Sequence, residues 1–179
     1  MLIGLDSHGQ VRDLYFPYVG LENHMDGHFI HKIGVWVDNR FSWIDDGTWK
    51  ITINYLKDTL AGYVLAINPS LQIQLDLTDT VYNEKNIFLR KAVLKNLSDS
   101  HRKIKLYFHQ EFEIYQARRG DTAYYDSQTQ TIIHYKGRRV FLINAAHGDK
   151  NFDDYSVGLF NIEGHEGTYR DAEDGVLSS

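Results

Sequence analysis

The chain has 179 residues, of which 42% are hydrophobic and 13% aromatic, enough to bury the core of one domain. Its formal net charge is -5, and acidic and basic residues are interleaved without a basic stripe, which argues against a nucleic-acid partner. The absence of cysteine excludes disulfides and thiolate metal sites. No apolar run approaches the roughly 20 residues of a membrane-spanning helix, and Asp6 interrupts the start where a secretory signal would be apolar. We therefore expect a cytoplasmic protein with no membrane association, unless a signal has been trimmed.

Apolar and polar residues alternate in short segments along the chain. The alternation is strict in residues 71–78, clear in 49–55, and less regular elsewhere. A period of two indicates strands with one buried and one wetted face. The strands predicted in chain order are residues 33–37, 40–44, 49–55, 62–67, 71–78, 87–97, 102–115 and 131–135.

Clusters of Asp, Asn, Gly, Ser and Pro separate these segments and favour tight turns. Most neighbouring strands should therefore pair antiparallel, and the turn at residues 98–100 should join 87–97 to 102–115 as a long hairpin. No segment predicts an amphipathic helix of ten or more residues, so the fold class is all-β, an antiparallel two-sheet sandwich. We assign it to residues 1–163. Residues 164–179 lose the strand pattern and are typical of a linker or docking segment.

Two sets of residues invite a chemical interpretation and have a plainer one. His24, His28 and His31 have the spacing of metal ligands on a helix, but Asp26 and Gly27 favour a turn there, so we predict no metal site. Glu111 and Glu113 could suggest the carboxylate pair of a glycosidase. On a strand they point the same way with no room for a bond between them, so we expect a solvated face.

Six aromatic residues crowd the first third of the chain: Tyr15, Phe16, Tyr18, Trp36, Trp43 and Trp49. Packing in the core is the better interpretation for most of them, and carbohydrate contact is the alternative for any that is exposed. Residues 15–24 form a loop with more aromatic and polar groups than a connection needs, which suggests contact with a neighbouring domain or with carbohydrate. The candidate residues are Tyr15, Phe16, Tyr18, Glu22, Asn23 and His24.

The same loop carries a family resemblance. Leu5-Asp6, Gly9 and the run from Arg12 to Pro17, followed by Glu22-Asn23-His24, resemble the opening of prokaryotic glycoside hydrolase family 15 enzymes, such as glucoamylases and trehalases. The Gly-Asn-Gly that typically precedes this stretch in the family is absent here. Residues 167–178 are similar to the segment that leaves the N-terminal domain in that family, and residues 88–91 and 121–125 with Asn96 also fit.

The resemblance implies a galactose-mutarotase-like super-sandwich, followed in the family by an (α/α)6 barrel that hydrolyses α-glucosidic bonds with inversion. Both catalytic carboxylates belong to that barrel, so we assign no catalytic residue and no cofactor to this chain. The implied partners are the barrel and the parent enzyme's α-glucan or α-glucoside substrate. The segment containing Arg170, Asp171, Glu173 and Asp174 would dock the linker.

Two alternatives remain open at this stage: a free-standing carbohydrate-binding module and a protein-interaction sandwich without sugar affinity. The first predicts affinity for glucans with a change in tryptophan fluorescence, and the second predicts association with another protein. An isolated domain would also expose the surface that normally meets the barrel, so self-association is expected.

Overall fold

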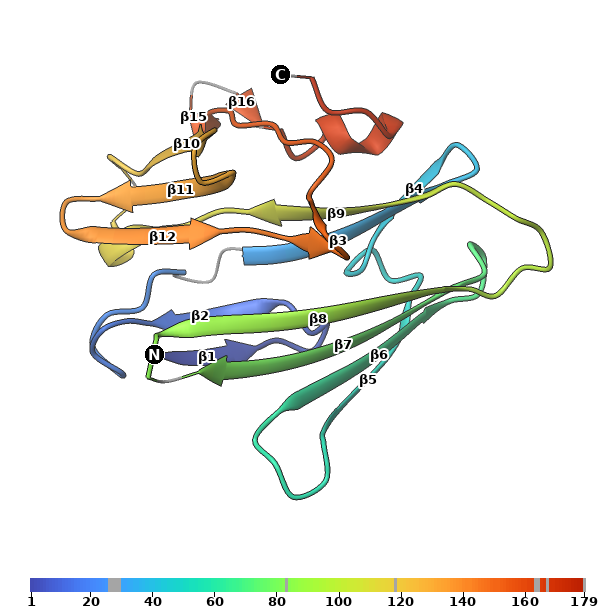
Figure 1. The fold of residues 1–179 in the computed structure, drawn as a ribbon, viewed down its shortest axis with the longest axis horizontal. Helices are drawn as coiled ribbons and strands as arrows, with labels where there is room; N and C mark the ends of the chain where they lie inside the picture. Colours follow the sequence, from blue (N-terminus) through green and yellow to red (C-terminus); the bar gives the residue numbers. More distant parts are fainter. Residues whose placement is uncertain (26–29, 83, 118, 163–164, 167, 179) are drawn as a thin grey trace.

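Antiparallel strands form two main sheets in the computed structural model, which describes residues 1–25, 30–82, 84–117, 119–162, 165–166 and 168–178 (Figure 1). The first sheet contains β1 (Leu2–Leu5), β2 (Val11–Tyr15), β3 (Ile30–Val37) and β4 (Arg40–Trp43) in that order, and β9 (Ile104–Gln110) pairs with β3. The second contains β5 (Lys50–Tyr55), β6 (Gly62–Asn68), β7 (Ile73–Tyr82) and β8 (Ile87–Asn96), also in order.

The smaller elements follow in the second half of the chain. A three-stranded sheet contains β10 (Thr122–Asp126), β11 (Thr131–Lys136) and β12 (Arg139–Ile143). Two short pairs are β13 (Ala146–His147) with β14 (Lys150–Asn151), and β15 (Phe160–Ile162) with β16 (His165–Glu166). The described helices are the single 3-10 turns η1 (Ile114–Gln116) and η2 (Asp171–Asp174), so the all-β antiparallel prediction is confirmed, and no described helix has the length and apolar character needed to cross a membrane.

The main core lies between the two large sheets. In β7 the alternation predicted from the sequence is real: Ile73, Leu75 and Leu77 are fully buried, while the residues between them are half-buried on the outer face. Ile33 and Val35 of β3 face them from the opposite sheet as part of the same cluster. Burying each such side chain contributes about 1.5–3 kcal/mol, so this interface holds the sandwich together.

A second cluster fills the space beneath β2 and β12. It contains Val11, Met25, Phe112, Ile114 and Phe141, all buried. The rings of Phe112 and Phe141 stack with centroids 4.9 Å apart. This cluster therefore attaches the β10–β12 sheet to the loop that follows β2.

The predicted hairpin between residues 87–97 and 102–115 is wrong. β8 pairs with β7 in the second sheet, whereas β9 pairs with β3 in the first, so the connection crosses from one sheet to the other. The strand itself also ends at Gln110 rather than at residue 115. The turn residues at 98–100 are correct for a reversal, but they gave no information about which sheet the chain enters next.

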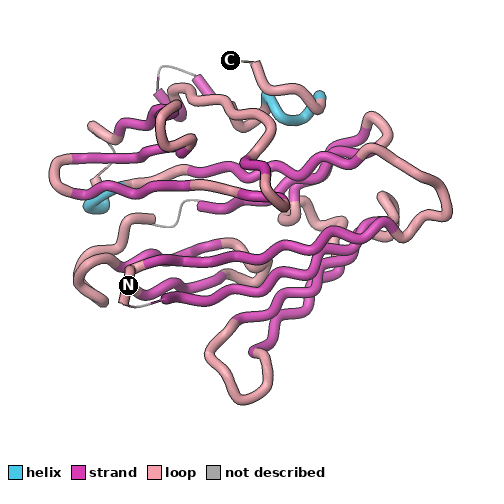
Figure 2. The backbone as a smooth tube through the Cα atoms, viewed as in Figure 1, coloured by secondary structure: helices cyan, strands magenta, loops and turns pink. Residues whose placement is uncertain are grey.

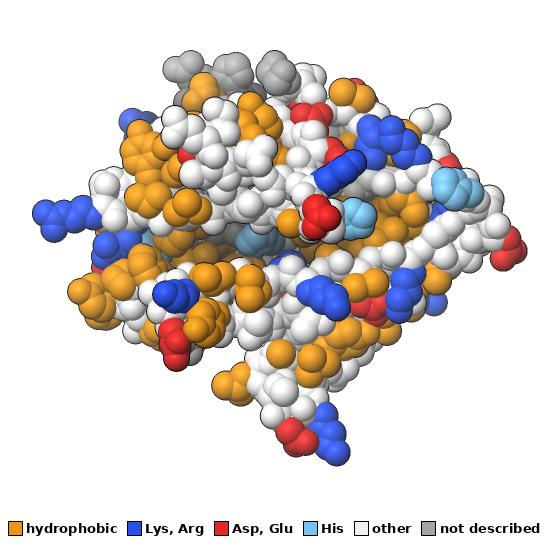
Figure 3. All heavy atoms as spheres, in the orientation of Figure 1, with side chains coloured by type: hydrophobic (Ala, Val, Ile, Leu, Met, Phe, Trp, Pro, Cys, Tyr) orange, Lys and Arg blue, Asp and Glu red, His pale blue; other side chains and the backbone are white. Residues whose placement is uncertain are grey.

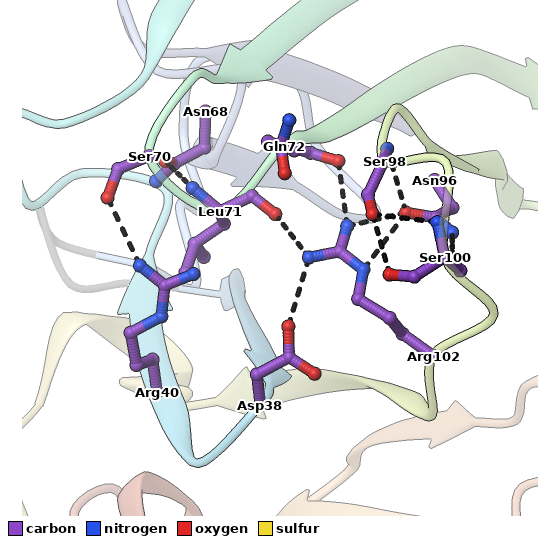
Figure 4. A network of polar contacts seen from close by, with 10 residues as sticks. All are labelled: Asp38, Arg40, Asn68, Ser70, Leu71, Gln72, Asn96, Ser98, Ser100 and Arg102. Carbon is purple, nitrogen blue, oxygen red and sulfur yellow. Dashed lines mark hydrogen bonds and ion pairs between the residues drawn. The ribbon is translucent and has the colours of Figure 1, made fainter.

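Arg102 explains the crossing, because its guanidinium bonds to both sides of the connection (Figure 4). It donates to the carbonyl oxygens of Leu71 and Gln72 at 2.9 and 3.0 Å, to Asp38 at 3.1 Å and to the side-chain oxygen of Asn96 at 3.0 Å. Only 7% of the side chain is exposed. A buried guanidinium needs most of its donors paired, and here the partners come from both main sheets.

The hairpin that joins β5 to β6 protrudes from the body of the molecule (Figure 2). Its apolar residues are poorly covered: Leu60 is 94% exposed and Tyr55 74%. Hydrophobic side chains also gather over β10–β12, at the left of Figure 3, while charged side chains are scattered over this face. The β5–β6 hairpin and the β10–β12 sheet therefore both carry exposed apolar groups.

Candidate functional site

The predicted loop after β2 folds back on itself. The backbone N–H of Phe16 donates to the carbonyl of Glu22 at 3.2 Å, and the N–H of Glu22 donates to the carbonyl of Tyr18 at 3.1 Å. An isolated antiparallel bridge between Tyr15 and Asn23 closes the base, and the Phe16–Pro17 peptide bond is cis. The structure thus brings all six predicted residues into one compact loop.

Asn23 serves as the internal support of this loop. Its side-chain oxygen accepts hydrogen bonds from the backbone N–H groups of Leu14 at 3.0 Å and Met25 at 3.2 Å, and its side-chain nitrogen donates to Asp13 at 2.9 Å. The residue is only 7% exposed. These bonds satisfy buried backbone donors that would otherwise lack partners, so Asn23 fixes the loop rather than presenting its amide to solvent.

His24 is fully buried and is fixed as one neutral tautomer. Its Nδ1 accepts a bond from the backbone N–H of Tyr115 at 3.2 Å, so Nε2 carries the proton and donates to the carbonyl of Phe16 at 2.5 Å. Burial lowers the pKa of His24, although the bond to Phe16 and the nearby Glu22 act in the opposite direction. The imidazole therefore connects the loop to η1 as an uncharged group.

Glu22 and Arg139 form the charged part of the site. The guanidinium donates to both carboxylate oxygens, at 2.8 and 2.9 Å, and lies 5.4 Å from the centroid of the Tyr115 ring. The hydrogen bonds from Arg139 lower the pKa of Glu22 below its usual value. A two-pronged pair of this kind orients both side chains, because its two parallel bonds fix the relative planes.

Sequence analysis missed Arg139 and Tyr115. Arg139 lies 117 residues from Glu22 along the chain, in a run of basic and apolar residues with no distinguishing pattern. No local signal in the sequence could have identified this partner. The long-range contact follows from the packing of β12 beside the loop, through Phe16 and Phe141, whose ring centroids are 6.1 Å apart.

The outer part of the loop is exposed. Tyr18 is 59% exposed, Val19 54% and Leu21 77%, while Tyr15 and Phe16 are half-buried. An exposed tyrosine among aliphatic side chains offers an apolar surface with one hydroxyl, which suits contact with a sugar or with another protein. Asn23 and His24 lie beneath this tip and support it.

The predicted docking segment lies on the outer face of β3, β4 and β9, at the upper right of Figure 1. The ring of Tyr169 stacks on Trp43 with centroids 4.7 Å apart, and Ala172 is buried. Lys105 donates to the carbonyl of Gly175. Residues 168–178 thus pack against the first sheet.

The charged residues of this segment have different surroundings. Arg170, Glu173 and Asp174 are exposed, whereas Asp171 is half-buried and accepts a bond from the backbone N–H of Ser178 at 2.6 Å. Asp174 accepts from the N–H of Val176 at 2.8 Å. The two aspartates therefore shape the segment itself, and Glu173 remains directed outward.

Neither the histidine set nor the glutamate pair forms the expected kind of site within the residues that the structure describes. His28 lies outside the described residues, and within them no group of three or more His, Asp or Glu is placed to hold a metal ion. The prediction that Glu111 and Glu113 share a solvated strand face is wrong, because β9 ends at Gln110 and Glu113 is only 4% exposed. The backbone N–H of Glu113 donates to the carbonyl of His24 at 3.0 Å, which turns this segment inward.

The comparisons with known proteins found a distant relative. The chain is 27% identical over 177 residues to a protein of Methanocaldococcus jannaschii named as an uncharacterized glycosyl hydrolase. The match covers 99% of this chain and 27% of that protein. No family model matches the chain, and no solved structure matches it. The chain is therefore a distant homologue of a protein named as a glycosyl hydrolase, and it spans about a quarter of that protein's length.

Proposed function

We propose that this chain is the non-catalytic N-terminal β-sandwich domain of a longer enzyme similar to glycoside hydrolase family 15. The observation that carries the proposal is the unequal coverage of the distant relative, which matches nearly the whole chain over only 27% of its own length. The all-β fold supports it, as do the motifs of the loop after β2. In this proposal the parent hydrolyses α-glucosidic bonds with inversion, using carboxylates outside this chain.

The test compares the 179-residue chain with the full-length protein that carries it. Both are incubated with maltose, trehalose and isomaltose, and the anomer first released is identified by proton NMR. We expect no hydrolysis by the chain alone and release of β-glucose by the full-length protein, since inversion converts an α-linkage to a β-product. Hydrolysis by the chain alone would overturn the non-catalytic assignment. The second glucose of trehalose leaves as α-glucose in either mechanism, so maltose and isomaltose decide: an initial excess of α-glucose over its equilibrium share from these two would overturn the family 15 mechanism.

The loop after β2 would lie at the mouth of the parent's active site, and its exposed tip would be the contacting part. Replacing Tyr18 by Ala in the full-length protein should lower kcat/KM by about tenfold, equivalent to about 1.4 kcal/mol. Tyr55→Ala is the control, since Tyr55 is also exposed, at 74%, but lies on the distant β5–β6 hairpin. Equal kcat/KM for the two variants would remove the loop from the active-site mouth. Arg170 and Glu173 are the proposed points of linker docking.

One observation favours the protein-interaction alternative. The outer face of β10–β12 exposes Tyr124 (46%), Val140 (48%) and Leu142 (62%) side by side on paired strands. Such a face often meets another protein. The test expresses the remaining part of the parent protein separately and sediments it together with this chain. Cosedimentation indicates that the partner is another part of the same protein, and its absence indicates an external partner.

A further inference from the structure

Two consecutive residues of η1 have a left-handed backbone conformation. Tyr115 has φ +64° and ψ +21°, and Gln116 has φ +54°. This conformation costs free energy for residues other than glycine. Burial of the side chains does not explain it, because Tyr115 is 38% exposed and Gln116 is also exposed. Backbone strain of this kind persists only where the surrounding structure fixes it, and it clusters at functional sites.

Buried groups on both sides hold Tyr115 in this conformation. The preceding residue, Ile114, is fully buried, and its backbone N–H donates to the carboxylate of Asp121 at 2.9 Å. The backbone N–H of Tyr115 donates to Nδ1 of the buried His24 at 3.2 Å. The loop after β2 therefore fixes the position of Tyr115 through His24.

The ring of Tyr115 lies beside the ion pair of Glu22 and Arg139. The guanidinium carbon of Arg139 is 5.4 Å from the ring centroid. Gly137, in the turn between β11 and β12, lies next to the hydroxyl end, since a Cβ there would be 3.7 Å from the Tyr115 hydroxyl. The hydrogen bonds with Glu22 raise the pKa of Arg139, and the nearby phenol groups of Tyr115 and Tyr18 act in the same direction. Both tyrosines thus lie near one guanidinium.

Three polar groups of this cluster are unpaired. Nη1 of Arg139 has no hydrogen-bond partner among the described residues, because Glu22 accepts from Nε and Nη2. It is also not one of the buried unpaired atoms that water cannot reach. The hydroxyls of Tyr18 and Tyr115 have no partner within the described chain, and these residues are 59% and 38% exposed. The cluster therefore offers accessible hydrogen-bonding groups held by a fixed support.

These groups suit a neutral ligand that carries several hydroxyls. Nη1 of Arg139 only donates, whereas a phenol hydroxyl both donates and accepts. Glu22 compensates the charge of Arg139, so the pair does not require a phosphate or a carboxylate as its ligand. A sugar ring also has an apolar face that suits contact with tyrosine rings.

We propose that Tyr115, Tyr18 and Nη1 of Arg139 contact the outer glucosyl unit of the parent's α-glucoside substrate, which is the unit that leaves after cleavage. The identity of the sugar rests on the proposed function. In this arrangement η1 and β12 each add one contact residue to the loop after β2. His24 is a positioning residue, because it acts through the backbone of Tyr115.

The first test removes one hydroxyl from the full-length protein. Steady-state kinetics use whichever of maltose, trehalose and isomaltose the unmodified protein hydrolyses fastest. Tyr115→Phe should raise KM about three- to tenfold with kcat unchanged, because a contact with a part of the substrate that does not react is equally strong in the ground and transition states. Tyr135→Phe is the matched control, since Tyr135 is 39% exposed on the outer face of β11. It should leave both constants unchanged.

The second test separates the ring of Tyr115 from its backbone conformation. Tyr115→Gly removes the ring and the strain together, and Gln116→Gly relaxes the same kind of strain at the neighbouring exposed position. Tyr115→Gly should raise KM by at least about tenfold, whereas Gln116→Gly should leave KM unchanged. Circular dichroism checks that both variants fold. If Tyr115→Gly does not fold, the two phenylalanine variants decide.

An equal KM for the Tyr115 variants and their controls would overturn the sugar contact, and so would a loss confined to kcat. Unchanged KM together with weaker cosedimentation of Tyr115→Gly with the remaining part of the parent would assign this surface to a protein contact instead. In both cases the unmodified protein still hydrolyses α-glucosides, so the proposed function stands. An unmodified full-length protein that is inactive on all three substrates would refute the proposed function, and the sugar contact with it.

Discussion

Among single residues, Arg102 joins the two main sheets through several hydrogen bonds. Its bonds reach the β6–β7 turn, the end of β8 and the β3–β4 turn. Removing one side of such a buried network leaves carbonyls and a carboxylate without their donor. The residue therefore has a stability role that its sequence context, a polar turn, does not show.

Arg102→Ala should lower the free energy of unfolding by about 2–4 kcal/mol, because it removes a buried charged donor with several partners. Urea denaturation followed by circular dichroism measures this change. Arg40→Ala is the matched control, since among the described residues Arg40 makes one long bond of 3.4 Å, to Ser70 (Figure 4). That variant should change stability by less than about 0.5 kcal/mol. An equal change in the free energy of unfolding for the two variants would show that the hydrogen bonds of Arg102 do not stabilise the fold.

In the candidate site, the position of the loop was predictable from the sequence, whereas the burial of its supporting residues was not. The loop was identified because aromatic and polar groups are dense there, and density is visible locally. The burial of Asn23 and His24 was not, because both residue types are usually exposed or intermediate. Their burial depends on η1 and β12, which contact the loop only after the chain has folded.

At the scale of elements, the C-terminal segment depends on a glycine where a side chain would not fit. Gly175 has φ +86°, and a Cβ there would lie 2.5 Å from Nε1 of Trp36. Gly47 has φ +84° with no heavy atom within 4 Å of such a Cβ. The two glycines have nearly the same positive φ but differ in the space around them.

Replacing each glycine by alanine separates these two effects. Gly47→Ala should lower the free energy of unfolding by about 1 kcal/mol, because alanine is strained in the left-handed conformation. Gly175→Ala should cost clearly more, or detach residues 168–178, because the indole ring of Trp36 cannot move easily. Urea denaturation and the wavelength of tryptophan emission measure the two outcomes. Identical unfolding free energies and spectra would contradict the close packing of this segment.

Strand positions were predictable because alternation is a local property, and β5, β6, β7 and β11 lie close to their predicted ranges. Pairing was predictable where a short turn follows a strand, as for β3 with β4 and β6 with β7. For the β8–β9 connection the same reasoning gave a wrong prediction. A turn permits a hairpin and an arch equally, and the choice is made by distant groups such as Leu71 and Gln72.

At the scale of the whole molecule, buried histidines make stability depend on pH. Burial lowers the pKa of His31 to about 3 and those of His109 and His134 to about 4, while that of His24 is also lowered. In the unfolded chain each returns to its ordinary value of about 6.5. The unfolded state therefore binds more protons as the pH falls.

The stability that these neutral histidines provide is complete above about pH 6.5 and is lost progressively as the pH falls towards 4. At pH 5 the loss should reach up to about 2 kcal/mol for each buried histidine. Urea midpoints at pH 7.5, 6 and 5 measure the slope. His134→Gln should reduce it, and His101→Gln, at an exposed position, should not. A flat profile between pH 7.5 and 5 would contradict this assignment.

The protruding β5–β6 hairpin gives the whole chain an exposed apolar projection. Replacing Leu60, which is 94% exposed, by Ser should leave the free energy of unfolding within about 0.5 kcal/mol of its original value. It should reduce any self-association of the chain, because an exposed leucine gains from burial between molecules. Sedimentation velocity over a range of concentrations tests this, with Lys57→Ser as a control. Unchanged association would exclude the hairpin as the contact.

The pairing of β3 with β9 also bears on the order in which the protein folds. Ile33 pairs with Phe108, whereas β5 to β8 are joined by short turns. Closing the longer loop costs more conformational entropy, so the β5–β8 meander should gain protection from hydrogen exchange before β9 does. During synthesis, the apolar face of β3 stays uncovered until the meander has left the ribosome, and its edge stays unpaired until β9 has followed. This long delay is the period when the nascent chain is most exposed to misassembly.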